Sequence, residues 1–217
     1  MRGHYDLHTH TTLTDGEMVP TELIHRMAML GYTTVAITDH ADYSNASDLI
    51  GTIIRIRESA ACYGVRLLCG VEITYVPPIQ IAPLALMAKK EGADVVVVHG
   101  ETTVEPVPPG TNHAACTCDS VDILAHPGLI TAEDAVAAAE RNIALEITSR
   151  GGHNRTNGHV VRIARETGCR LVIDSDAHAP QDLLDERAKW MVSRGAGLTE
   201  DEARKALSLN IEDWLGI

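Results

Sequence analysis

Short apolar runs rich in Val, Ile and Leu recur along this chain and alternate with segments of helical periodicity. The runs lie at residues 4–8, 34–38, 67–72, 94–99, 121–125, 143–147 and 171–175. The four consecutive valines at 95–98 form a continuously apolar stretch, which is typical of a parallel strand buried on both faces. Strands that alternate with helices predict βα units and a parallel sheet.

Helix start and stop signals lie between these apolar runs. Pro20 stands at a favourable first helical position, Gly31 follows at the far end, and the apolar residues between them recur on one face. Near the C-terminus, Thr199 and Glu202 have the spacing of a capping box. We therefore expect one helix from residue 20 and another that begins close to residue 200.

The chain length limits how many βα units can form. With 217 residues the chain fits a single domain, which we place at residues 1–217. An eight-stranded barrel typically needs about 250 residues. The strand candidates therefore favour a compact seven-stranded βα barrel similar to a TIM barrel, and a flat doubly wound sheet is the alternative.

The charge balance is acidic and argues against some classes of partner. Lys and Arg number 18 and Asp and Glu number 30, so the formal net charge at pH 7 is −12. Proteins that bind long nucleic acids usually carry a basic surface, so we expect a small-molecule partner instead. The sequence shows no signal peptide and no run of about 18 apolar residues, so we expect no membrane partner. The scattered cysteines fit reduced thiols in a cytoplasmic protein.

One connection lacks a helical pattern. Residues 100–120 join the fourth apolar run to the fifth and carry Glu101, Asn112 and His113. Long loops without secondary structure in compact domains are often functional lids. We therefore expect an irregular loop that leaves the barrel at its functional end.

Imidazoles and carboxylates stand at the ends of most predicted strands. In a βα barrel the carboxyl ends of all strands converge on one face, so these side chains are expected to meet there. Buried imidazoles and carboxylates are costly without partners, and a shared cation is an economical one. The candidate metal ligands are His8, His10, Asp15, His40, Glu72, His99, His126, Asp176 and His178.

The number of candidate ligands exceeds what a single ion can use. They suffice for two or three divalent ions, and mixed imidazole and carboxylate ligands suit Zn, Mn or Fe. Asp39 and Asp174 neighbour candidate ligands and are expected to orient imidazoles by hydrogen bonds. Asp174 is also an alternative ligand in place of Asp176.

The joint pattern of these segments resembles the PHP (polymerase and histidinol phosphatase) family. The matching segments are Asp6-Leu7-His8-Thr9-His10, Thr38-Asp39-His40, Val71-Glu72, Val98-His99-Gly100, Ala125-His126-Pro127-Gly128 and Ser175-Asp176-Ala177-His178. The resemblance implies a distorted seven-stranded βα barrel with a trinuclear metal site. It places one ion at His8, His10, Glu72 and Asp176, a second at Glu72, His99 and His126, and a third at Asp15, His40 and His178. Glu72 would bridge the first two ions.

The resemblance also implies hydrolysis of a phosphate ester by attack of a metal-bridging hydroxide on phosphorus. Glu72, Asp176 and His178 are the ligands to which we assign a catalytic role. Four further residues are candidates for binding substrate. Two of them are arginines that can grip phosphate oxygens, and two are histidines that can donate a proton to the leaving oxygen. They are Arg150, Arg155, His153 and His113.

The substrate expected from the sequence is a small phosphorylated metabolite. The resemblance makes L-histidinol phosphate a leading candidate for a phosphomonoesterase. The alternative within the family is a phosphodiesterase or exonuclease acting on nucleotides, which would need aromatic side chains for the bases, and the chain has few of them, 2 Trp and 5 Tyr. Amidohydrolase-type C–N hydrolysis and a non-enzymatic metal-binding module are further alternatives. The sequence leaves the native metal and the oligomeric state open.

Overall fold

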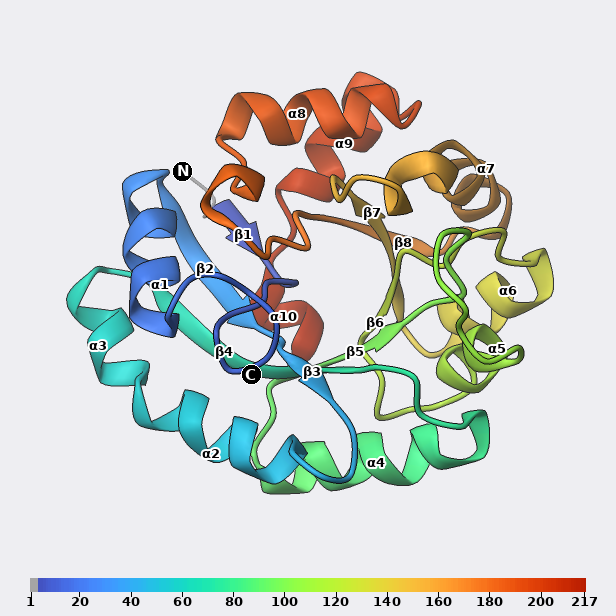
Figure 1. The fold of residues 1–217 in the computed structure, drawn as a ribbon. Coiled ribbons are helices and arrows are strands. Elements are labelled where there is room, and N and C mark those ends of the chain that lie inside the picture. Colours follow the sequence, from blue (N-terminus) through green and yellow to red (C-terminus); the bar gives the residue numbers. More distant parts are fainter. Residues whose placement is uncertain (1–3) are drawn as a thin grey trace.

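Seven parallel strands form the centre of the structure, a computed structural model that describes residues 4–217 (Figure 1). They follow the chain in the order β1-β2-β4-β5-β6-β7-β8, and the two-residue β3 (His40–Ala41) pairs with β4. Each of the seven apolar runs overlaps one of these strands, so the prediction is confirmed. The bounds are β1 His4–Asp6, β2 Tyr32–Ile37, β4 Arg66–Ile73, β5 Val95–His99, β6 Ile123–Ala125, β7 Ala144–Thr148 and β8 Arg170–Asp174.

The sheet curves into a nearly closed barrel, and the seam between β8 and β1 is joined just beyond the ends of the two strands. Thr9 and Ala177 form a parallel bridge there. The backbone N–H of His10 donates to the Ala177 carbonyl at 2.9 Å, and that of Asp176 donates to the His8 carbonyl at 3.0 Å. The predicted barrel is therefore confirmed, and the flat doubly wound alternative is wrong.

Buried carboxylates also join β8 and β1 closer to the strands themselves. Asp174 Oδ1 accepts a hydrogen bond from the Leu7 N–H at 2.8 Å, and Asp6 Oδ1 accepts one from the Ser175 N–H at 3.2 Å. Lys189 is fully buried beside them, and its ammonium donates to the Tyr5 carbonyl. Side-chain hydrogen bonds thus replace part of the missing strand ladder.

Helices surround the barrel, with their apolar faces against the outer side of the strands (Figure 1). α1 begins at Pro20 as predicted, and the Thr199–Glu202 capping box at the start of α9 is present. Two short 3-10 turns cover His153–Thr156 and Pro180–Asp182. The helices are α1 Pro20–Met29, α2 Ala46–Arg55, α3 Arg57–Cys62, α4 Pro78–Glu91, α5 Thr111–Cys116, α6 Ala132–Glu140, α7 Asn157–Thr167, α8 Glu186–Gly195, α9 Glu200–Leu207 and α10 Ile211–Leu215.

A second, smaller core fills the barrel interior. Inward-facing residues such as Leu68 and Val97 pack there against Ile211 of α10. Trp214 of the same helix donates its indole N–H to the Asn142 carbonyl, next to the start of β7. α10 therefore closes the amino-terminal end of the barrel and leaves the carboxyl end open. Within residues 4–217, no helix has the length and apolar character of a membrane span.

The connection at 100–120 differs from the prediction of an irregular loop, because it contains α5. The helix has only six residues, too few to show a periodic pattern in the sequence. Glu101 fixes its start, since Oε1 accepts hydrogen bonds from the backbone N–H groups of Gly110 and Asn112, each at 2.9 Å. The irregular parts are residues 100–110 before the helix and 117–120 after it.

Candidate metal centre

The nine candidate ligands meet at the carboxyl end of the barrel around a cavity of about 560 Å³. His8 and His10 are fully buried and contact the residues that line this cavity. The lining includes Asp15, His40, Glu72, His99, His126, Asp176 and His178. Side chains far apart in the sequence thus lie together, in the arrangement that the strand-end pattern predicts.

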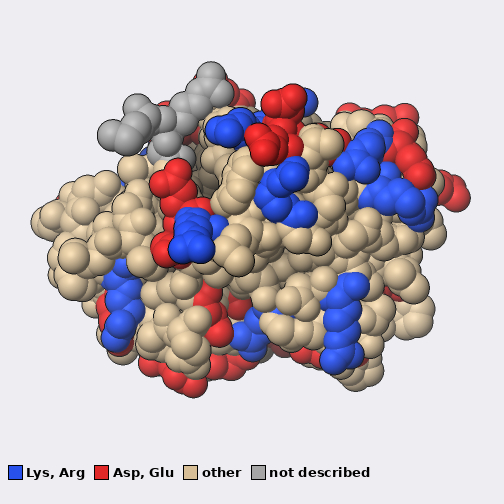
Figure 2. Space-filling view, turned by 90° about the horizontal axis from the view of Figure 1, so that it is seen from above, with Lys and Arg blue, Asp and Glu red and all other residues tan. Residues whose placement is uncertain are grey.

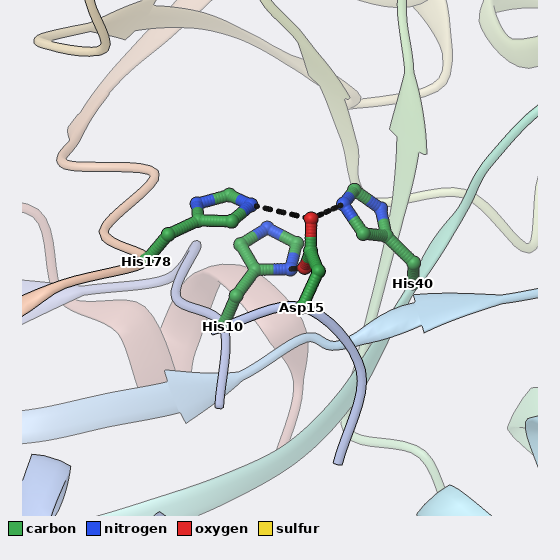
Figure 3. Close-up of side chains that lie close together, drawn as sticks. All are labelled: His10, Asp15, His40 and His178. Atoms are coloured by element: carbon green, nitrogen blue, oxygen red, sulfur yellow. Dashed lines mark ion pairs between the residues drawn. The ribbon is translucent and has the colours of Figure 1, made fainter. Parts of the chain in front are cut away.

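One group of ligands surrounds Asp15, in the loop after β1 (Figure 3). Its Oδ2 lies 3.5 Å from His40 Nε2 and 3.4 Å from His178 Nε2, and its Oδ1 lies 4.0 Å from His10 Nδ1. The three imidazoles converge on this carboxylate from different segments of the chain. The structure therefore adds His10 to the set of three residues that the family resemblance implies for one ion.

Glu72, at the end of β4, lies between this group and the remaining ligands. Its Oε2 is 2.7 Å from His40 Nδ1, whereas its Oε1 is 3.3 Å from His8 Nε2 and 3.5 Å from His126 Nε2. The side chain is fully buried. One carboxylate thus faces imidazoles on both sides, which is the placement that a bridging ligand needs.

Asp176 completes the group around His8 and His10. The Nε2 atoms of these two imidazoles are 3.0 Å apart, and Asp176 Oδ1 lies 3.3 Å from His10 Nε2. Its Oδ2 lies 3.6 Å from His126 Nε2. Ligand atoms bound at about 2.0–2.2 Å to one tetrahedral ion are roughly 3.3 Å apart, so these separations fit shared ions.

Several polar atoms in the centre are buried without a hydrogen-bond partner. They include His10 Nδ1, Glu72 Oε1 and His126 Nδ1. Unpartnered polar atoms are costly to bury, and a cation beside the Glu72 carboxylate would offset that cost. The residues therefore fit metal ions, and their overlapping groups are consistent with a multinuclear site.

The protonation of the centre reflects its burial and its close charges. Burial opposes ionisation of Glu72, but the neighbouring charges of His8, His40 and His99 hold its pKa well below the ordinary value. Burial lowers the pKa of His10 to about 3. At His8, burial is outweighed by the carboxylates of Glu146, Asp176 and Glu72, which raise its pKa well above the ordinary value. An anionic carboxylate and a neutral imidazole are the forms that bind metal.

Glu146, on β7, is a functional residue that the sequence interpretation missed. Its Oε1 lies 2.7 Å from His8 Nδ1, and its Oε2 accepts the backbone N–H of His126 at 2.9 Å. A carboxylate at Nδ1 fixes the tautomer so that Nε2 faces the ligands. The available signal was a single acid inside the apolar strand Ala144–Thr148.

Asp39 and Asp174 were expected to orient imidazoles, but in the structure their carboxylates bind backbone N–H groups and a hydroxyl. Asp39 accepts hydrogen bonds from the Thr11 N–H at 2.8 Å and from the Thr14 hydroxyl at 2.6 Å. Asp174 holds the Leu7 N–H across the seam. Both carboxylates therefore position the backbone of ligand-bearing segments. Asp176 lines the cavity and Asp174 does not, which favours Asp176 as the ligand.

Two ligand-bearing residues have strained backbone conformations. His126 has a φ of 27° and Asp176 a φ of 53°, in the left-handed region that non-glycine residues seldom adopt. The Glu146 carboxylate holds the His126 N–H, and the His8 carbonyl holds the Asp176 N–H. Strain held in this way is concentrated at functional sites in proteins.

The structure brings two of the four predicted substrate-binding residues to the cavity. Arg150 is half-buried there, with Nη1 at 3.4 Å from Asp182 Oδ2, and His153 is buried beside it. Arg155 is exposed and faces a separate hollow. His113 is 64% exposed and lies 2.8 Å from an Asp134 oxygen, away from the cavity. The placement therefore supports a substrate role for Arg150 and His153 only.

The PHP domain family matches residues 4–105, a range that contains six of the nine candidate ligands. The chain belongs to the PHP domain family. The other three candidate ligands, His126, Asp176 and His178, lie beyond the matched range and join the same centre in space. With its buried groups of His, Asp and Glu, this PHP-family protein is assigned to the metal-dependent phosphoesterases.

Relatives of the PHP-family chain have diverse names. An uncharacterized protein of Methanocaldococcus jannaschii is 48% identical over 205 residues, which cover 94% of each chain. The ribonuclease P protein component 3 of Methanosarcina mazei is 29% identical and covers 94% of this chain and 85% of its own length. Histidinol phosphate phosphatase of Lactococcus lactis, solved with zinc, L-histidinol and phosphate, superposes with a TM-score of 0.64 at 13% identity. That superposition covers 91% of this chain and 95% of the phosphatase, and it shows a shared fold.

Proposed function

We propose that this protein is a phosphomonoesterase that acts on a small phosphate ester, and histidinol phosphate is the first substrate to test. The observation that carries the proposal is the cavity of about 560 Å³, whose lining combines the clustered ligands with the single arginine Arg150. A cavity of this size suits a metabolite. The acidic net charge of −12 also favours a small ligand over a polyanion.

The proposed chemistry divides between bound ions and the side chains of the chain. Divalent ions in this centre would supply a water of lowered pKa and positive charge for the phosphate. Arg150 can bind two phosphate oxygens with its guanidinium fork. His153, whose Nε2 faces the cavity beside Glu105, is the candidate proton donor to the leaving oxygen. Glu72 and Glu146 hold the imidazoles in place.

We propose three ions, bound as the overlapping groups suggest, with Zn, Mn and Fe as the candidate metals. One group surrounds Asp15 and two others share Glu72, while a fourth, of His8, His126 and Glu146, overlaps both of the Glu72 groups. Elemental analysis of protein purified without added metal measures the stoichiometry. A value of one ion per chain at full activity would contradict a trinuclear centre.

A substrate panel tests the function. The same metal-analysed sample is assayed on histidinol phosphate, nucleoside monophosphates, a dinucleotide and an aryl phosphate. We expect phosphate release from small monoesters, loss of activity in Glu72→Gln, and no loss in the exposed control Glu133→Gln. Absence of activity on every member, with the metals bound, would exclude the proposed phosphatase.

The second candidate is a nuclease or nucleotide phosphodiesterase. It is favoured by the similarity to the ribonuclease P component and by Tyr43 and Tyr75, which are 50% and 49% exposed just beyond β3 and β4 and offer faces for base stacking. On the face drawn in Figure 2, however, basic side chains are scattered among acidic ones and form no continuous track for a nucleic-acid backbone. Faster hydrolysis of the dinucleotide than of any monoester would favour the nuclease.

A further inference from the structure

The irregular segment 100–110 places one carboxylate inside the cavity, where it folds back toward His99 at the end of β5. Glu105 lines the cavity although it belongs to neither a strand nor a helix. The first residues of the segment are anchored, because the Glu101 N–H donates to Asn112 Oδ1 at 2.9 Å. A Cβ added at Gly152 would lie 3.4 Å from the Val104 side chain, so the segment rests against the loop that follows β7.

The carboxylate of Glu105 is held by three groups from other parts of the barrel. Its Oε2 lies 3.0 Å from His99 Nε2 and accepts the Tyr75 hydroxyl at 3.0 Å. Its Oε1 lies 3.3 Å from His153 Nε2. Both carboxylate oxygens are therefore bound, in the way that two oxygens of a phosphate would be.

These contacts are also what ties the tip of the segment down. In the described part of the chain, the other hydrogen bonds of residues 103–109 are local, such as Val107 N–H to the Glu105 carbonyl. His99 is a candidate metal ligand, so the carboxylate sits on the open side of the centre where a substrate oxygen has to enter. The Tyr75 ring stacks on His99 with an interplanar angle of 27°, and Tyr75 itself has a strained φ of 55°.

We propose that Glu105 is an internal substitute for the substrate phosphate. Its carboxylate fills an anion position that His153 and Tyr75 form beside the candidate ligand His99, and the segment 100–110 is a lid that releases Glu105 when a phosphate group binds. The proposal rests on the proposed function, since it assumes that a phosphate group enters this cavity. It assigns to Glu105 the role of a competitor of the substrate, in addition to the residues proposed to bind the substrate.

The first test measures binding of inorganic phosphate to the metal-loaded protein by calorimetry, without turnover. Glu105→Gln removes the competing charge, so we expect phosphate to bind about tenfold more tightly than in the wild type. Asp42→Asn is the matched control, because Asp42 is an exposed acid that lines the same cavity and has no contact with the lid. Equal gains in phosphate affinity in the two variants would mean that the loss of any negative charge near the cavity is sufficient, and would overturn the proposal.

The second test uses the unmodified chain. Amide hydrogen exchange of residues 102–109 is followed by mass spectrometry with and without inorganic phosphate. We expect faster exchange when phosphate is present, because the lid loses its attachment to the barrel. Unchanged or slower exchange at saturating phosphate would contradict the proposal. Absence of phosphate binding by both the wild type and Glu105→Gln would contradict it as well.

The two tests separate this inference from the proposed function. If the wild type hydrolyses small monoesters and Glu105→Gln binds phosphate no better, the inference fails and the phosphatase stands. If no ester is hydrolysed but phosphate still displaces the lid, the phosphatase proposal fails and the inference about Glu105 stands. Tyr75→Phe, which removes one of the three groups that hold Glu105, should give a smaller gain in phosphate affinity than Glu105→Gln.

Discussion

Replacement of Glu146 by Gln tests how the barrel prepares a metal ligand. The native carboxylate accepts two hydrogen bonds, from His8 Nδ1 at 2.7 Å and from the His126 N–H at 2.9 Å. Gln keeps the size of the side chain but has one oxygen and one NH₂ group, so it can accept only one of the two bonds. If the NH₂ group faces His8, the imidazole takes the other tautomer, with the proton on Nε2.

The size of the effect follows from these two contacts. Leaving one buried donor unsatisfied costs about 1–3 kcal/mol in the free energy of unfolding. Loss of a carboxylate that orients a metal-binding imidazole typically lowers metal affinity by about 10–100-fold. Both Glu146 and His8 are fully buried, so solvent cannot substitute for the missing acceptor.

The assay is competitive metal titration with a chromophoric chelator, together with urea unfolding. Glu133→Gln, at an exposed position in the first turn of α6, is the matched control and should change neither quantity. A Glu146→Gln protein that keeps wild-type metal affinity within about twofold would refute the reasoning, because the tautomer of His8 would then not depend on this carboxylate.

Three further predictions concern stability. A Cβ at Gly128, where φ is 60°, would lie 2.0 Å from a neighbouring backbone oxygen, so Gly128→Ala should cost about 2 kcal/mol or more, whereas Gly151→Ala, with open space, should be nearly neutral in thermal denaturation. Lys189→Met removes the buried ammonium that donates to the Tyr5 carbonyl, so denaturant unfolding should show a loss of about 1–3 kcal/mol; an unchanged midpoint would mean that this hydrogen bond does not stabilise the seam. Removal of metal with a chelator should lower the melting temperature, and re-addition of the metal should restore it, since ions that bind only the folded state stabilise it.

The strands, and the convergence of the nine candidate ligands at one end of the barrel, could be predicted because both depend on local signals. Continuous apolar runs such as Val95–His99 mark buried strands, and a strand end fixes where His99 points. Glu146 and Glu105 could not be found in this way. Glu146 contacts His8, 138 residues away, through barrel closure, and Glu105 reaches His99 from an irregular segment. Such contacts depend on tertiary packing, which the sequence pattern of a single segment does not encode.

The same dependence explains why two of the four predicted substrate residues lie away from the cavity. Arg150 and Arg155 flank one glycine-rich stretch in the sequence, but the short 3-10 turn His153–Thr156 directs them to different hollows. His113 lies on α5, a helix too short to be recognised from its sequence. Such differences in position arise where a turn of a few residues decides which way a side chain faces.

The seam between β8 and β1 makes the metal centre part of the closure of the barrel. The residues that join the two strand ends, at 8–10 and 176–178, also carry four of the nine candidate ligands. Ions bound by these residues would cross-link the ends of β8 and β1, where the strand pairing of the barrel is interrupted. Occupancy of the centre would then set how often the barrel opens at this joint, so the supply of metal would govern the lifetime of the protein as well as its activity.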